Sequence, residues 1–175
     1  MTAPSANPLL RDHAATLAFW ILRLWLGLRA LITGLEKFSG STVEHAPLLD
    51  EFGQPDISGA MVEVTHKTYG WAHYHGLPPA LAQKFAAEPL LPEWSLSLFD
   101  RLLGPALVLT GLTLLFGVAP RLTLFAQGIL YVLLTVGLIL INENAGIAWL
   151  GMHVLLVVAA LRLVEHDRFS LLSRW

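Results

Sequence analysis

Four long apolar blocks constrain the fold of this chain more than any other feature. They cover residues 14–35, 98–118, 122–141 and 146–164. A helix of about 20 apolar residues, rising roughly 1.5 Å per residue, crosses the hydrocarbon core of a bilayer, which is ~30 Å thick. Inside that core an open segment must be helical, because no other open structure pairs all of its backbone N–H and C=O groups. The blocks therefore predict four transmembrane helices.

Short links fix the topology of the last three blocks. Ala119–Arg121 joins the second block to the third, and Asn142–Ala145 joins the third to the fourth. Links this short force neighbouring helices to run antiparallel, so these three blocks are expected to form an up-down-up bundle. Pro120 suits the end of one helix or the start of the next.

The segment 36–97, between the first and second blocks, is expected to fold as a cap on one membrane face. Within it, residues 57–69 carry apolar side chains at helical spacing, which predicts a short amphipathic helix, and residues 79–87 predict a second one. The chain is therefore expected to be an all-α integral membrane protein, a four-transmembrane-helix bundle. It forms a single domain over residues 1–175, with a short tail at 165–175.

Composition excludes several classes of protein. The chain carries 11 Lys and Arg residues against 13 Asp and Glu, a net charge of −2, and has no basic run that would mark a nucleic-acid binder. It contains no cysteine, which excludes disulfides, thiol catalysis and thiolate-bound metals on this chain alone. His73 and His75 are weak candidates for metal ligands, but the chain has no HExxH motif. We expect no metal, and no cofactor held by this chain alone.

Basic residues near the helix ends predict the orientation. With an even number of spans, both termini lie on one side, and the basic residues of that side are Arg11, Arg121, Arg162, Arg168 and Arg174. Those of the other side are fewer and are outnumbered by acids: Lys37, Lys67, Lys84 and Arg101. The positive-inside rule therefore places both termini of this multi-pass chain in the cytoplasm and the cap outside a prokaryotic cytoplasmic (inner) membrane.

Arg23 and Arg29 are the charges within the first block, and a charge inside a spanning helix is a functional candidate by default. Arg23 lies near the middle of the block and shares a helix face with Gly27, Ala30 and Gly34. Small residues mark a face that packs closely on another helix, so Arg23 should face the bundle interior. It is either an anchor for an anionic or carbonyl-bearing ligand or a structural Arg bonded to carbonyls or a carboxylate. No carboxylate is expected at its depth, which strengthens the case for the ligand and leaves both alternatives open.

Counting residues along each block brings further polar groups together nearer the outer face. They include Arg29, Asp100, Glu143 and His153, of which His153 lies roughly level with Arg29. A buried histidine beside carboxylates can relay protons near neutral pH. The alternatives are structural: a core His153 bonded to one neighbour, an Arg29 that snorkels to the interface, and an Asp100 that forms a charge pair with Arg101.

Four residues resemble the first-helix signature of the DoxX-type membrane proteins at this spacing: Arg23, Gly27, Gly34 and Lys37. The end of the chain, with Gly151, His153 and residues 167–171, also looks like the close of such proteins, and the four-span layout matches. The long cap departs from the compact DoxX form and is more similar to the DoxD branch. The resemblance implies a small membrane subunit that works beside a partner chain, as in a thiosulfate:quinone oxidoreductase.

Three functions follow from these features. The first is a membrane subunit of a quinone-linked redox complex, in which Arg23, Arg29 and His153 bind a quinone or relay protons and a partner chain supplies the electrons. The second is a non-catalytic anchor or assembly subunit for a peripheral enzyme. The third is a small-solute transporter or channel, which would have to oligomerise because four spans are few. The chain is at most one subunit of a quinone-dependent oxidoreductase. Its expected partners are the lipid bilayer and another subunit or further copies of itself.

Overall fold

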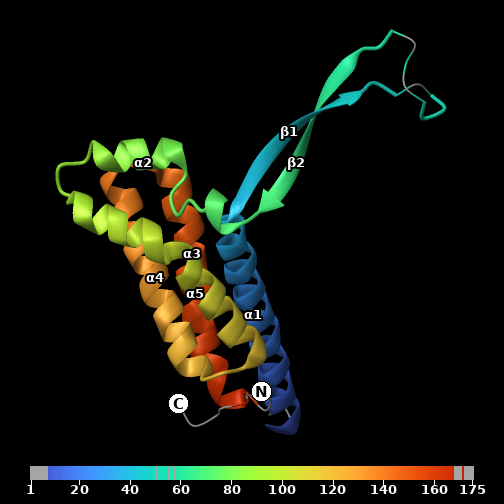
Figure 1. Ribbon diagram of the computed structural model, residues 1–175. Coiled ribbons are helices and arrows are strands. Elements are labelled where there is room, and N and C mark those ends of the chain that lie inside the picture. Colours follow the sequence, from blue (N-terminus) through green and yellow to red (C-terminus); the bar gives the residue numbers. More distant parts are fainter. Residues whose placement is uncertain (1–7, 50, 55, 57, 168–170, 172–175) are drawn as a thin grey trace.

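The computed structural model describes residues 8–49, 51–54, 56, 58–167 and 171, and its body is a bundle of four long helices (Figure 1). These helices are α1 (Pro8–Glu36), α3 (Glu93–Phe116), α4 (Pro120–Leu140) and α5 (Asn144–Leu163). Each is long and apolar enough to cross a membrane. The short links make α3, α4 and α5 run antiparallel, each to the next, as their lengths predict, and the start of α1 and the end of α5 lie at the end of the bundle opposite the cap.

Helix boundaries differ from the predicted blocks mainly at the starts. α1 begins at Pro8 and α3 at Glu93, several residues before the apolar blocks that they contain. Both helices therefore extend beyond the apolar spans through short stretches of mixed polar and apolar residues. α4 begins at Pro120, where the fixed φ of proline suits the first helical turn. α3 ends at Gly117, whose φ of 71° is the left-handed conformation typical of a helix C-terminus.

Glycines allow α1 and α3 to pack closely. α1 packs against α3 and α5, and α4 packs against the same two helices, so the four form a closed ring. A Cβ atom on Gly34 would lie 2.7 Å from the backbone nitrogen of Val108, and one on Gly111 would lie 2.6 Å from that of Leu31. Backbone contact of this kind needs small residues, which confirms the predicted packing face of α1.

The cap is not all helical, which corrects the predicted fold class. Strands β1 (Ser39–Pro47) and β2 (Met61–Tyr69) pair antiparallel, from Ser39 opposite Tyr69 to Pro47 opposite Met61. The amphipathic helix predicted over 57–69 is therefore wrong from Met61 onward, and Ile57 lies outside the described residues. The β-branched residues Val62, Val64, Thr65 and Thr68 explain the strand, because such side chains favour an extended backbone.

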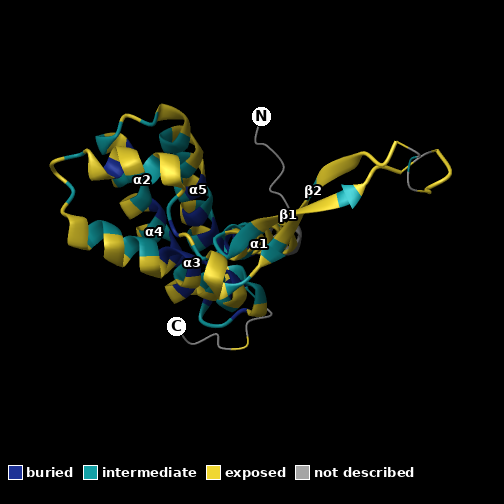
Figure 2. Ribbon diagram, turned by 45° about the horizontal axis from the view of Figure 1, so that its top comes forward, coloured by how far each residue is buried: buried dark blue, intermediate teal, exposed yellow. Residues whose placement is uncertain are grey.

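The hairpin of β1 and β2 projects away from the bundle, and most of its residues are exposed (Figure 2). Its base is held where Gly70 donates to the carbonyl of Phe38 and His75 donates to that of Lys37. The ring of Phe38 also contacts the ring of Tyr74, with centroids 4.8 Å apart. The cap thus has a projecting part and a base fixed to the bundle.

The second predicted cap helix is confirmed as α2 (Pro79–Ala86). It crosses the end of the bundle near the hairpin base. Phe85 is buried beneath it, and the Lys84 ammonium lies 2.7 Å from the Glu143 carboxylate in the link between α4 and α5. The cap therefore joins the bundle through α2 as well as through the hairpin base.

Candidate functional site

Arg23 of α1 is buried near the end of the bundle that lies opposite the cap, called the terminal end. There it joins α1 to the end of α3 and to the segment that follows α5. Its Nε donates to the carbonyl of Leu114 at 2.7 Å, and Nη2 donates to that of Leu115 at 3.1 Å. Its Nη1 lies 3.2 Å from the carboxylate of Asp167, and both side chains are about 3% exposed. The guanidinium also lies over the ring of Trp20, 5.2 Å from its centroid.

These contacts make Arg23 a brace at the end of α3. The last carbonyls of a helix lack partners within the helix and carry partial negative charge, which a guanidinium satisfies. Glycine suits position 117 beside it, because its φ of 71° is strained for other residues and a Cβ atom there would displace the Arg23 guanidinium. The expectation that Arg23 lacks a carboxylate partner is therefore wrong. Asp167 follows the last span and folds back onto α1, which depth counting along the helices did not capture.

Asp100 and Glu143 also hold the fold together. The Asp100 carboxylate accepts a hydrogen bond from the backbone N–H of Leu77 at 2.7 Å. The carbonyl of the same residue accepts one from the Tyr74 hydroxyl. Glu143 pairs with Lys84 of α2. Both carboxylates therefore fix the cap to the bundle, and neither lines the cavity that contains His153.

Arg29 and His153, in contrast, meet at one cavity, as their predicted common level suggests. This cavity, called the His153 cavity below, has a volume of about 150 Å³ and a mostly apolar lining. It is lined from all four long helices by Arg29, Thr33, Leu107, Tyr131, Leu134, Trp149, Leu150 and His153. At about 1.5 Å per residue, Arg29 lies roughly 10 Å below the end of α1. The cavity is thus inside the apolar part of the bundle, in the half nearer the cap.

His153 carries an unsatisfied nitrogen at this cavity. Its side chain is 4% exposed, and Nδ1 lies 2.9 Å from the carbonyl oxygen of Trp149. A carbonyl only accepts, so Nδ1 holds the proton and Nε2 of the neutral ring is an acceptor. Among the described residues Nε2 has no hydrogen-bond partner. Such a buried group costs free energy unless a ligand or water satisfies it.

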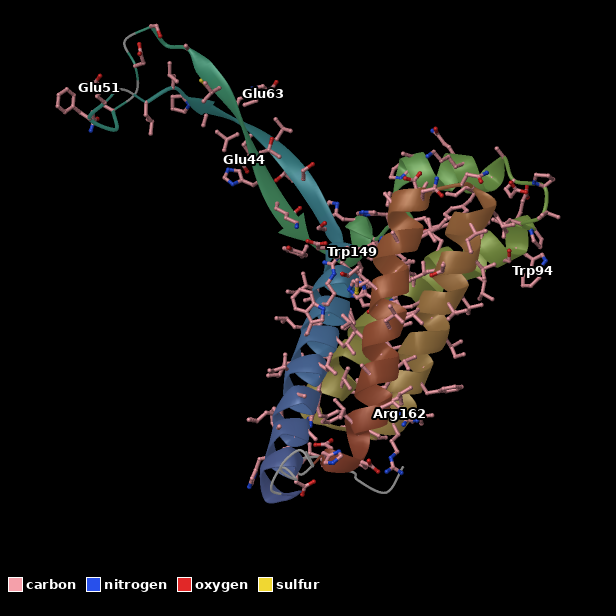
Figure 3. All side chains as sticks on the ribbon, turned by 180° about the vertical axis from the view of Figure 1, so that it is seen from behind. Glu44, Glu51, Glu63, Trp94, Trp149 and Arg162 are labelled. Atoms are coloured by element: carbon pink, nitrogen blue, oxygen red, sulfur yellow. The ribbon has the colours of Figure 1, made fainter. Side chains whose placement is uncertain are left out.

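Arg29 supplies the complementary donors. Its guanidinium lies 5.7 Å from the centroid of the Trp149 ring, as in a cation–π contact. The described part of the chain places no carboxylate within ion-pair distance of it. Trp149 is 53% exposed and lies on the surface near the hairpin base (Figure 3), so the cavity wall that it forms reaches the outside of the bundle.

Two further polar residues belong to this region, and of these Tyr131 was missed from the sequence. Gln127 is fully buried, and its amide donates to the carbonyl of Leu26 at 3.2 Å and to the hydroxyl of Tyr131 at 2.9 Å. Tyr131 lines the cavity, and its ring centroid lies 5.5 Å from that of His153. The available signal was a Gln with a Tyr four residues later, which share one helix face inside a span.

Lys37, the last residue of the family pattern, lies just beyond α1. Burial lowers the pKa of its ammonium, while the carboxylates of Asp100 and Glu36 act in the opposite direction. Of the other pattern residues, Gly27 and Gly34 face α3 and Arg23 braces its end. The pattern therefore describes one packed face of α1.

The histidines of the cap do not gather around a common point. Nδ1 of His75 lies 2.9 Å from the carbonyl oxygen of His73, and Nε2 of His73 lies 3.4 Å from the hydroxyl of Thr68. Within the described ranges, no group of three or more His, Asp or Glu side chains could hold a metal ion.

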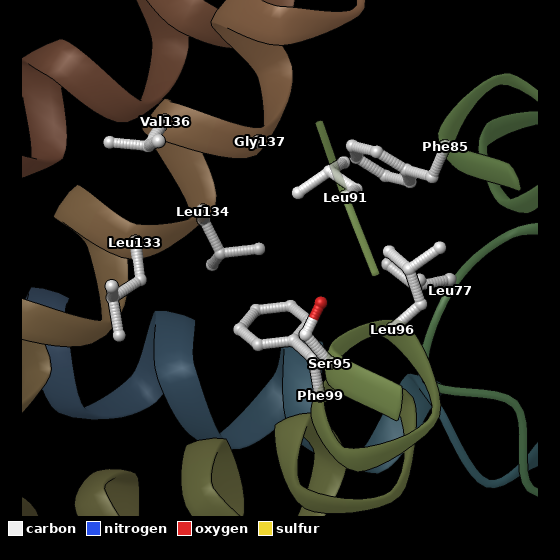
Figure 4. Close-up of a pocket in the computed structure, with 10 residues that line it drawn as sticks. All are labelled: Leu77, Phe85, Leu91, Ser95, Leu96, Phe99, Leu133, Leu134, Val136 and Gly137. Carbon is white, nitrogen blue, oxygen red and sulfur yellow. The ribbon is translucent and has the colours of Figure 1, made fainter. Parts of the chain in front are cut away.

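A second cavity, of about 240 Å³, lies beneath α2 and is apolar (Figure 4). Phe85, Phe99 and Leu134 are among its lining residues. The one hydroxyl in its wall belongs to Ser95, which already donates to the carbonyl of Pro92. This cavity offers contacts to hydrocarbon and no polar chemistry.

Comparisons with protein-family models, with curated proteins and with solved structures found no match to this chain.

Proposed function

We propose that this chain is the membrane subunit of a quinone-linked redox complex and that the His153 cavity holds the quinone head group. The unsatisfied Nε2 of His153, in a cavity whose lining also includes Arg29, is the observation that carries the proposal. A hydroxyl of the reduced ligand would donate to Nε2, and a carbonyl of the oxidised ligand would accept from Arg29. One site would then recognise both redox forms.

The size and lining of the cavity support a ring-shaped ligand. An apolar cavity of about 150 Å³ is large enough for one benzene ring, and the Trp149 and Tyr131 side chains offer aromatic contacts. Leu134 lines both this cavity and the apolar one beneath α2. A hydrocarbon tail would therefore find an apolar lining next to the head group.

The chain itself acts as a binding subunit in this proposal. The quinone supplies the redox chemistry, and a partner chain supplies the electrons, because the sequence carries no flavin or metal motif. The resemblance to the DoxX and DoxD proteins agrees with such a subunit. Arg121 and Arg162 lie at the terminal end of the bundle, which favours cytoplasmic termini and a cap outside a prokaryotic inner membrane. Arg168 and Arg174, also used in that argument, lie outside the described residues.

Quinone affinity of the purified chain in lipid nanodiscs tests the proposal. We expect His153→Phe, which keeps a ring of similar size but removes the acceptor, to weaken binding of a short-chain quinol. We expect Arg29→Gln to weaken binding of the oxidised quinone. Loss of one hydrogen bond to a charged or buried group, about 1.5–3 kcal/mol, corresponds to roughly 10- to 100-fold in Kd.

Matched variants elsewhere on the chain control for general effects. His66 is exposed on the hairpin and Arg101 is exposed on α3, and neither lines the cavity. His66→Phe and Arg101→Gln should therefore leave both affinities unchanged. Equal quinol affinity in the His153→Phe and His66→Phe variants would remove the proposed site.

A membrane anchor for a peripheral enzyme is the second candidate, and the projecting hairpin favours it. An isolated two-stranded hairpin is at best marginally stable in water, so binding of a partner would stabilise it. Replacing residues 41–67 with a short Gly-Ser linker should abolish co-purification of a partner enzyme and leave quinone binding intact. Unchanged co-purification would remove the hairpin from this role.

A further inference from the structure

A third cavity, with a polar lining, lies at the base of the hairpin. This vestibule has a volume of about 280 Å³ and is lined by Thr33, Glu36, Lys37, Ser39, Lys67 and His75. It is built from the end of α1, both strands of the hairpin and the segment that follows the hairpin. All six lining residues have polar side chains, and Glu36 and His75 are exposed. The vestibule therefore belongs to the aqueous surface on the hairpin side.

Thr33 lines both the vestibule and the cavity that contains His153. On α1, Arg29, Thr33 and Glu36 are spaced by four and three residues, which puts them on one helix face. This polar stripe rises about 10 Å along the helix from the cavity to the vestibule. Two cavities that appear separate thus share a wall residue and a continuous polar face.

Charges in the vestibule are largely balanced. The Lys67 ammonium lies 3.9 Å from the Glu36 carboxylate, and Lys37 lies within the electrostatic reach of Glu36 and Asp100. Paired charges of both signs hold water and offer no excess of positive charge for an anion. Hydration is therefore the property that this lining favours.

We propose that the vestibule is the aqueous entrance to the intramembrane cavity, through which water and protons from the hairpin side reach His153 past Thr33. The titratable groups that face His153 around the cavity are Arg29 from α1 and Tyr131 from α4, and α3 contributes Leu107. His153 lies at the inner end of the passage, and its buried Nε2 has no hydrogen-bond partner among the described residues.

Thiol labelling tests this passage directly, because the chain has no cysteine of its own. Single variants Thr33→Cys and Leu150→Cys place a thiol in the cavity wall. Leu155→Cys is the matched control on the same helix, because Leu155 is 64% exposed on the outside of the apolar span. Phe52→Cys, near the hairpin tip and 87% exposed, reports how many molecules in proteoliposomes carry the hairpin outside.

A membrane-impermeant, charged methanethiosulfonate reagent is added outside the vesicles. A thiol reacts as the thiolate, which forms in water and not in hydrocarbon, so we expect Leu150→Cys to react at least about tenfold faster than Leu155→Cys. Thr33→Cys should react faster still. Equal rates for Leu150→Cys and Leu155→Cys would overturn the passage. If Leu150→Cys fails to fold, Thr33→Cys against Leu155→Cys decides in the same way.

Labelling needs no quinone, so the passage and the proposed function can fail separately. When a short-chain quinone is added, we expect it to slow labelling of Leu150→Cys and leave Ser39→Cys, in the vestibule, unchanged. Fast labelling of Leu150→Cys without protection keeps the passage and removes the quinone site. If labelling of Leu150→Cys is slow but quinone affinity still depends on His153, the passage is refuted and the quinone site stands.

Discussion

Replacing Arg23 should destabilise the bundle and spare ligand binding. Arg23→Met keeps much of the apolar stem but removes the guanidinium, which lies 3.2 Å from the Asp167 carboxylate in a contact where both side chains are about 3% exposed. It also leaves the last carbonyls of α3 without their donors. Removal of one partner from a buried ion pair costs about 3–5 kcal/mol. For a chain of this length that corresponds to a fall in Tm of roughly 6–20 °C.

Thermal unfolding in detergent, followed by circular dichroism, measures this effect. Arg23→Lys should lie between the native chain and Arg23→Met, because Lys keeps the charge but cannot form the planar fork of contacts. The double variant Arg23→Met/Asp167→Leu should recover part of the loss, since it removes both charges of this ion pair. If the Arg23→Met variant has the same Tm as the native chain, the structural role of Arg23 is refuted. If the Arg23→Lys variant folds but binds quinone as weakly as Arg29→Gln, Arg23 belongs to the ligand site.

Two further predictions concern packing and pH. The Gly34→Ala variant should be less stable than the Gly151→Ala variant by about 1–3 kcal/mol. Both changes gain the same helix propensity, but only the Cβ atom at position 34 would lie 2.7 Å from a backbone nitrogen of α3. Comparison of the two melting temperatures checks this. Burial lowers the pKa of Lys37 in the folded chain, so the unfolded chain binds more protons between the folded and unfolded pKa values, and stability from this group rises with pH there. The gap in Tm between the native chain and Lys37→Met should therefore change in the native chain's favour across the alkaline range, and a gap independent of pH would contradict it.

The helical part of this fold is readable from the sequence because the bilayer leaves few alternatives. A long apolar run has to be a helix in lipid, and the three- and four-residue links leave only antiparallel neighbours. The cap lies outside that constraint. Residues 61–69 satisfy both a helical spacing of apolar side chains and the β-branched preference for strands, and pairing with 39–47 decides for the strand. That partner is distant in the sequence, so local periodicity could not reveal it.

Only part of the candidate site could be predicted from the sequence, for a related reason. Counting residues along straight helices gives depth, and it placed Arg29 and His153 together correctly. Depth does not say which side chains face each other, so Arg23, Asp100 and Glu143 were grouped with a ligand although the fold uses them in structural contacts. The partner of Arg23 follows the last span, where no helix count could place it.

The state of the His153 imidazole tests the central claim most directly. The chain has seven histidines, and nitrogen-15 NMR of histidine-labelled protein in nanodiscs separates their ring nitrogens, with the His153 signals assigned by their loss in His153→Phe. The account predicts a protonated Nδ1 and an unprotonated Nε2, and a shift of that Nε2 signal alone, toward a hydrogen-bonded acceptor, when a short-chain quinol is added. An Nε2 signal that does not move at saturating quinol would contradict it.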